Sequence, residues 1–118
     1  MTQANLNTAI RKPFPTISII DLQGEVTGQS ESALMDAFAE ANNGDTKTIL
    51  LNFSGLEYMN SSGIGLLVTL LIRTQRQKQH LLACGLSEHY QEIFNLTRLN
   101  EAIAIYPDEA EAMAAVQV

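Results

Sequence analysis

The stretch that decides the fold lies in the middle of the chain and changes its hydrophobic period once. It reads Leu50-Leu51-Asn52-Phe53-Ser54-Gly55-Leu56-Glu57-Tyr58-Met59-Asn60-Ser61-Ser62-Gly63-Ile64-Gly65-Leu66-Leu67. Residues 48–53 have the length and the polar borders of a buried central strand. From Ile64 onward the apolar residues follow a helical period instead. We therefore predict a strand, a connection and the start of an apolar helix.

The expected helix begins at four small residues, Asn60-Ser61-Ser62-Gly63. Side-chain oxygens of Asn and Ser accept the free backbone N–H groups of a first turn, so these residues are candidate caps. The same N–H groups and the helix dipole also favour an anion. Two hydroxyl groups therefore lie where a phosphate would be tolerated.

Composition excludes several classes of protein. The chain has 118 residues, of which 46% are apolar and 17% charged, as in a globular domain. It has no run of eighteen apolar residues and no secretory signal at its N-terminus. The net charge of −6 argues against binding to nucleic acid or to an anionic membrane. We expect a single domain over residues 1–118 in the cytoplasm.

Catalytic and metal-binding patterns are missing from the sequence. A single cysteine, Cys84, excludes an internal disulfide and leaves too few thiols for a cysteine-based zinc site. The two histidines, His80 and His89, do not have HExxH spacing, and no Gly-x-Ser-x-Gly elbow is present. We therefore predict no catalytic residue, no metal and no cofactor, and we expect Cys84 to be an inert core thiol.

Strand and helix patterns alternate along the chain. The expected strands cover residues 6–10, 16–22, 48–53, 81–86 and 102–106, and residues 23–28 are expected to form a loop. The expected helices begin near Ser30, Ser61, Ser87 and Pro107. This order predicts an α/β fold with a mixed, mostly parallel sheet of about five strands, covered by about four helices, with the first strand at an edge.

The layout and the central stretch resemble the STAS domain, the fold of bacterial anti-sigma factor antagonists. The resemblance covers residues 6–116. Its main pieces are residues 17–26, 49–54, 58–65, 86–88 and 93–97. The central motif of that family is Asp-Ser-Ser/Thr-Gly, and its first serine is the one phosphorylated. The resemblance therefore implies that Ser61 is the phosphoacceptor, with Ser62 as the runner-up.

The resemblance also implies partners. In the family, a serine kinase that is also an anti-sigma factor, of the histidine-kinase-like ATPase type, phosphorylates the antagonist, and a serine phosphatase reverses this. The unphosphorylated antagonist sequesters the kinase and frees a sigma factor. The expected partner-binding residues are Gly24, Glu25, Asn60, Ser61, Ser62, Gly63, Gly65, Leu66 and Leu70. Two alternatives stay open, a scaffold subunit of a larger signalling assembly and a small-ligand-sensing STAS domain.

Two residues depart from the family pattern. Asn60 stands where the motif has Asp, and Asn52 stands where many members have another Asp. Both changes are expected to remove negative charge near Ser61, although Asn60 can still cap the helix.

The helical period of the second helix assigns its faces. It places Ile64, Leu67, Val68, Leu71 and Ile72 on the buried face. From that face Ser61 is expected to point sideways and Ser62 outward. Leu66 and Leu70 then lie on the opposite side, where they either contact a neighbouring helix or form an exposed patch that marks an interface. Gly63 and Gly65 are expected to allow another backbone to approach closely.

Overall fold

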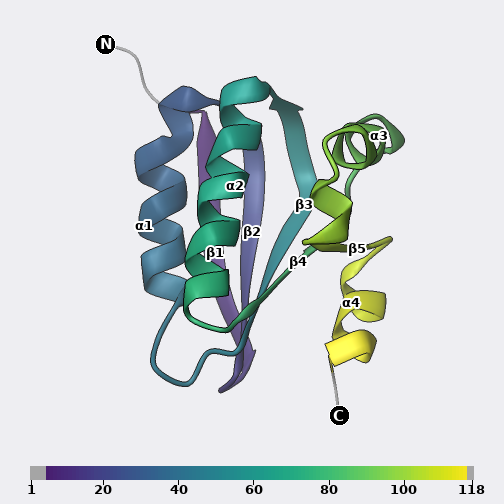
Figure 1. Ribbon diagram of the computed structural model, residues 1–118. Helices are drawn as coiled ribbons and strands as arrows, with labels where there is room; N and C mark the ends of the chain where they lie inside the picture. The colour runs from purple at the N-terminus through teal and green to yellow at the C-terminus, as the bar shows by residue number, and fades with distance from the viewer. Residues whose placement is uncertain (1–4, 117–118) are drawn as a thin grey trace.

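One mixed sheet with helices on both faces organises the chain (Figure 1). The computed structural model describes residues 5–116. The strands are β1 (Leu6–Phe14), β2 (Ile17–Val26), β3 (Thr48–Met59), β4 (His80–Cys84) and β5 (Ala104–Tyr106). The helices are α1 (Glu31–Ala41), α2 (Ser61–Arg76), α3 (Glu88–Leu96) and α4 (Glu109–Val116), with short 3-10 turns η1 (Gly28–Ser30) and η2 (Leu99–Glu101).

The strand order in the sheet is β1-β2-β3-β4-β5. β1 pairs antiparallel with β2. The pairs β2–β3, β3–β4 and β4–β5 are parallel. This arrangement confirms the predicted mixed, mostly parallel sheet, with β1 at one edge. Among residues 5–116, no helix combines the length and the apolar character needed to cross a bilayer.

Two central strands are longer than their apolar runs. Residues 23–26, expected to be a loop, continue β2, and residues 54–59, expected to belong to a connection, continue β3. These two extensions pair with each other from Gln23↔Gly55 to Val26↔Met59. The extensions lie beyond the apolar centre of the sheet, and they therefore contain polar residues and glycines. Such a composition does not predict a strand.

β1 also continues past its expected end, through Pro13 to Phe14, with an irregular register between Arg11 and Phe14. Proline is tolerated there because an edge strand has one side without ladder partners.

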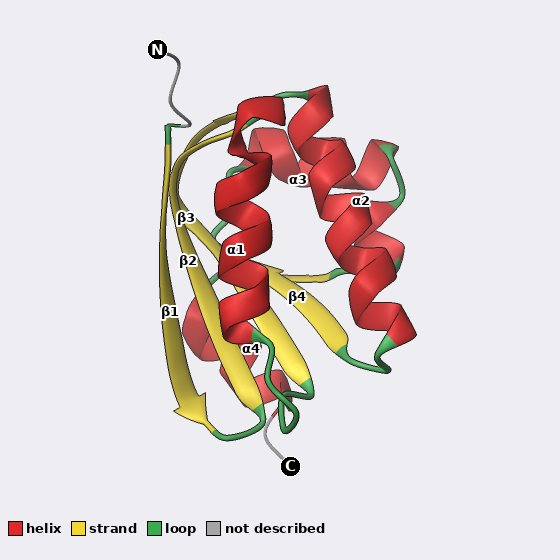
Figure 2. Cartoon of the chain, turned by 90° about the vertical axis from the view of Figure 1, so that its left-hand side faces the viewer, coloured by secondary structure: helices red, strands yellow, loops and turns green. Residues whose placement is uncertain are grey.

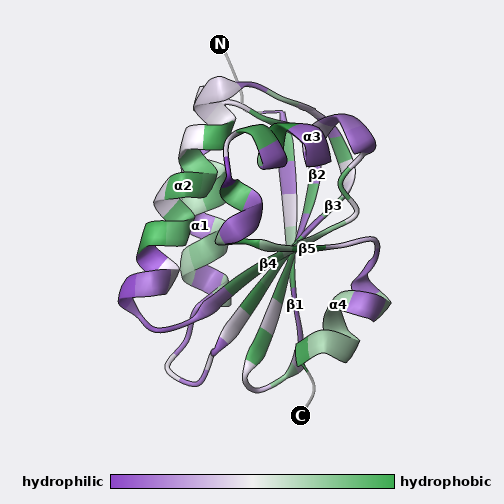
Figure 3. Ribbon diagram, turned by 45° about the vertical axis from the view of Figure 1, so that its right-hand side comes forward, coloured by the Kyte–Doolittle hydropathy of each residue, from purple (hydrophilic) through white to green (hydrophobic). Residues whose placement is uncertain are grey.

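The main core lies between one face of the sheet and the helices α1, α2 and α3, which cover that face (Figure 2). Phe53 of β3 and Phe94 of α3 meet edge to face near its centre, with ring centroids 6.4 Å apart. A smaller cluster lies on the other face, where Ile19, Leu50 and Leu82 pack under α4. Figure 3 shows this division, with α1 and α2 on one side of the strands and α4 on the other.

The buried face of α2 differs from the expected one. Its buried residues are Gly63, Leu66, Leu67, Leu70 and Thr74. Leu66 is 8% exposed and Leu70 is fully buried, so the predicted exposed patch on these two leucines is wrong. Val68 and Ile72, expected in the core, are instead 37% and 45% exposed.

The reason for this error is that α2 has two apolar faces. Of the nine residues from Ile64 to Ile72, seven are Ile, Leu or Val, so the helical period fits two overlapping stripes that share Leu67. Gly63 decides between them, because the absence of its side chain lets this stripe pack directly on the carbonyl of Val26 at the end of β2.

We predict that Leu66→Ala lowers the free energy of unfolding by about 2–5 kcal/mol, because it leaves a cavity in the main core. The matched control is Ile72→Ala on the exposed face of the same helix, which should change that free energy far less. Urea denaturation of the two variants measures both effects. Equal losses would show that the two faces of α2 are packed alike.

Candidate functional site

The candidate site is the start of α2, at the carboxyl end of the parallel strands. Asn60 occupies the N-cap position with an extended backbone, and its Oδ1 accepts a hydrogen bond of 2.9 Å from the N–H of Gly63. The amide therefore caps the helix, as expected for Asn in place of Asp. The cap satisfies one of the free N–H groups of the first turn and defines where the helix begins.

Gly63 positions this first turn against the end of β2. A Cβ on Gly63 would lie 2.0 Å from the carbonyl oxygen of Val26, which no side chain can tolerate. The N–H of Asn60 also donates to that oxygen, at 3.3 Å. The expected close approach of another backbone is thus confirmed for Gly63, and the other backbone belongs to the sheet.

Gly65 is different, because a Cβ there would meet nothing within 4 Å. Its lack of a side chain is not needed by the fold.

Ser61 and Ser62 are both exposed, and neither makes a side-chain hydrogen bond with any residue of the described part of the chain. They are therefore not caps, because Asn60 performs that role. Ser62 faces η1, since a Cβ on Gly28 would lie 3.5 Å from its Cβ. Measured from the observed buried face of α2, Ser61 lies on the outward side and Ser62 to the side. This is the reverse of the expectation from the helical period.

Tyr90 of α3 fixes the last residue of β3, a contact that sequence reasoning did not find. Its hydroxyl oxygen accepts a hydrogen bond of 2.8 Å from the N–H of Met59. That N–H is buried, so the phenol supplies the partner that a neighbouring strand would otherwise give. No sequence signal links Tyr90 to residue 59.

Gly24 and Glu25 lie in the β2 extension, close in register to the end of β3. Gly24 has a φ of +108°, and a Cβ there would lie 2.0 Å from the carbonyl oxygen of Asn5. The fold itself therefore requires glycine at position 24. Glu25 pairs with Tyr58, one residue from the Val26↔Met59 pair that leads to Asn60. The structure thus brings Glu25, Tyr58 and the start of α2 to the same end of the sheet.

Asn52 does not belong to this site. Its side chain donates to Asp21 at 2.8 Å and accepts from the Ser54 hydroxyl at 2.7 Å, on the face of the sheet that carries α4. The expectation that Asn52 removes negative charge near Ser61 is therefore wrong. Arg11 completes this network, because its guanidinium binds both Asp21 and Glu109. Its hydrogen bonds to the Asp21 carboxylate hold the pKa of that group below its usual value.

Cys84 is fully buried beside this network, and burial raises the pKa of its thiol to about 11. The carboxylates of Glu109 and Asp108 add to the rise. The thiol therefore stays protonated at neutral pH and is a poor nucleophile. Within residues 5–116, no three side chains of His, Cys, Asp or Glu are grouped as ligands for a metal ion.

The sequence matches the model of the STAS domain family over residues 9–112, so the chain belongs to that family. The fold is similar to a solved anti-sigma factor antagonist from Mycobacterium paratuberculosis, with a TM-score of 0.81, 18% identity and 98% of both chains covered. It is also similar to the Bacillus cell fate determinant SpoIIAA in its phosphorylated form, with a TM-score of 0.67, 22% identity, and 94% of this chain and 100% of that chain covered.

A third similar structure is a sulfate transporter family protein from Wolinella succinogenes. Its TM-score is 0.73 at 16% identity, and the match covers 84% of this chain and 83% of that one. At these sequence identities the three structural matches show a common fold, and they do not show a common function.

We predict that Asn60→Ala lowers the free energy of unfolding by about 1 kcal/mol, because the N–H of Gly63 loses its partner. Asn60→Asp should retain the cap and the stability, since a carboxylate oxygen accepts the same hydrogen bond. Asn7→Ala on exposed β1 is the control for an asparagine outside the site. Urea denaturation checks all three variants, and a loss in Asn60→Ala no larger than in Asn7→Ala would contradict the capping role.

Proposed function

We propose that the protein is a phosphorylation-switched anti-sigma factor antagonist, with Ser61 as the phosphoacceptor. In this proposal the unphosphorylated form binds a serine kinase that is also an anti-sigma factor, of the histidine-kinase-like ATPase type, and so frees a sigma factor. A serine phosphatase restores the binding form. The protein acts as a single STAS domain in the cytoplasm, without catalysis of its own.

One observation carries the proposal. Ser61 presents an exposed hydroxyl group that makes no hydrogen bond with residues 5–116, on the first residue of a helix that Asn60 already caps. A kinase can reach such a hydroxyl without breaking a contact of the fold. The family membership and the anti-sigma factor antagonists among the similar structures support the same role.

The orientation of α2 favours Ser61 over Ser62. Ser61, Gly65, Val68 and Ile72 lie on one outward line of the helix, opposite its buried face. Ser62 instead lies toward Gly28 of η1. A partner that covers the outward line of α2 therefore meets Ser61 first.

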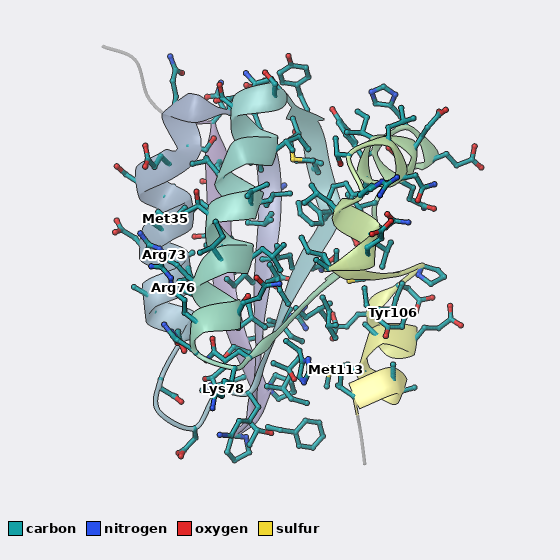
Figure 4. All side chains as sticks on the ribbon, in the orientation of Figure 1. Met35, Arg73, Arg76, Lys78, Tyr106 and Met113 are labelled. Atoms are coloured by element: carbon teal, nitrogen blue, oxygen red, sulfur yellow. The ribbon has the colours of Figure 1, made fainter. Side chains whose placement is uncertain are left out.

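The charges around Ser61 support a switch by repulsion. Residues 23–31 and 54–72 contain Glu25, Glu31 and Glu57 but no Lys, Arg or His. Arg73 and Arg76 come later in α2 and point toward α1 (Figure 4). A phosphate adds about −1.5 to −2 charges, which these segments cannot neutralise. The phosphate group on Ser61 therefore faces the partner with its full charge. Burying that charged group in an apolar interface costs free energy of desolvation.

The exposed residues of α2 define the partner surface of this proposal. Val68 and Ile72 are exposed, and Ile64 and Leu71 beside them are half-buried. This surface replaces the one expected on Leu66 and Leu70, which are in the core. The absence of a side chain on Gly65 leaves room between Ser61 and Val68 for a partner backbone.

We predict that incubation with the cognate serine kinase and ATP adds one phosphate to the protein. Ser61→Ala should abolish the modification, whereas Ser62→Ala should retain it, because only Ser61 lies on the outward line of α2. Intact-mass spectrometry and peptide mapping measure the result. Phosphate mapped to a loop away from α2 would refute the proposed switch.

We also predict that Ile72→Ala weakens binding to the kinase by about 2 kcal/mol if Ile72 anchors the interface, while the fold remains stable. The matched control is Leu96→Ala, which removes an exposed leucine (77% exposed) at the end of α3. Calorimetric titration compares the two variants with the original protein. Equal affinities for Ile72→Ala and Leu96→Ala would exclude the outward face of α2 as the partner surface.

A further inference from the structure

The face of the sheet that carries α4 is only partly covered. α4 has eight residues, and its contacts concentrate on Ile19, Leu50, Leu82 and Cys84. Figure 4 shows Met113 and Tyr106 between this helix and the strands. α4 does not cover the beginnings of β2, β3 and β4, and a groove of about 560 Å³ lies there.

The groove is apolar inside and carries basic groups. Ile17 and Leu82 of the sheet and Ala115 of α4 form its apolar walls. Lys47 and His80 line it as well, and no Asp or Glu of residues 5–116 does. Among the described residues that line the groove, Lys47 carries a positive charge at neutral pH, whereas the whole chain has thirteen Asp and Glu against seven Lys and Arg.

The backbone holds these two basic residues at fixed positions. The N–H of Lys47 donates to the carbonyl of Thr16 at 2.8 Å, and the N–H of His80 donates to the carbonyl of Lys47 at 2.9 Å. Three strand beginnings are thus joined side by side. Neither Lys47 nor His80 forms an ion pair with another residue in the range 5–116. Arg11, on the same face of the sheet, is already bound by Asp21 and Glu109.

We propose that this groove binds a small amphipathic carboxylate, with its anionic group at Lys47 and His80 and its apolar body against Ile17, Leu82 and Ala115. Charge complementarity supports the anion, since neither Lys47 nor His80 forms an ion pair within the described part of the chain. The volume lies in the range of pockets that hold small organic ligands, about 300–1,000 Å³. The site lies across the sheet from α2 and does not depend on the proposed phosphorylation.

The test is a titration of the full chain with sodium decanoate, below the concentration at which decanoate forms micelles. Amide chemical shifts of the ¹⁵N-labelled protein report where it binds. We expect saturable shifts at the beginnings of β2, β3 and β4 and at the end of α4. Decanol, which has the same apolar body but no charge, should bind more weakly.

Two variants test the role of the basic groups. Lys47→Glu should weaken decanoate binding roughly tenfold, because it replaces attraction by repulsion at an exposed site. The matched control is Lys78→Glu, which makes the same change of charge at an exposed lysine outside the groove and should leave the affinity unchanged. Ala115→Leu, which fills part of the groove from the helix side, should also weaken binding.

Several results would overturn the proposal. These are an absence of saturable binding, equal affinities in Lys47→Glu and Lys78→Glu, or shifts confined to the exposed face of α2. A fourth is a shift of the groove residues with protein concentration alone, because this would assign the groove to a second copy of the chain.

Discussion

The close approach of Gly63 to the carbonyl of Val26 is the constraint on which the site depends. Because residue 63 has no Cβ, the first turn of α2 can pack directly on the end of β2. The Asn60 cap then satisfies the N–H of Gly63, and the Tyr90 hydroxyl satisfies that of Met59 just before it. Ser61 and Ser62, which follow Asn60, are exposed, and their hydroxyl groups make no hydrogen bond with residues 5–116.

The two faces of the sheet are stabilised in different ways. The face under α1, α2 and α3 carries a large apolar core, in which Phe53 and Phe94 pack edge to face. The face under α4 has a small apolar cluster and a polar network in which Arg11 joins Asp21 of β2 to Glu109 of α4. The larger groove, of about 560 Å³, lies on the second face. The two proposed sites therefore lie on surfaces of different character, an exposed helix face and a groove with basic groups.

Much of the fold could be predicted from local patterns. The alternation of apolar strands and helices predicted the mixed sheet and the edge position of β1. The motif Asn60-Ser61-Ser62-Gly63 predicted the start of α2 within its four residues, because caps and small residues act within a single turn. The extensions of β2 and β3 were missed, since residues 23–26 and 54–59 are strands only because they pair with each other.

By itself, the sequence determined the class of fold, the place where α2 begins and the position of the candidate serines. These features depend on helix capping and on the hydrophobic period, and both can be read within a single segment of the sequence. Only the tertiary structure decided which side of α2 faces the sheet. Leu66 and Leu70 are as apolar as Val68 and Ile72, so composition cannot rank the two stripes. The choice follows from the fit of Gly63 against Val26 of the sheet, a contact between segments that are far apart along the chain.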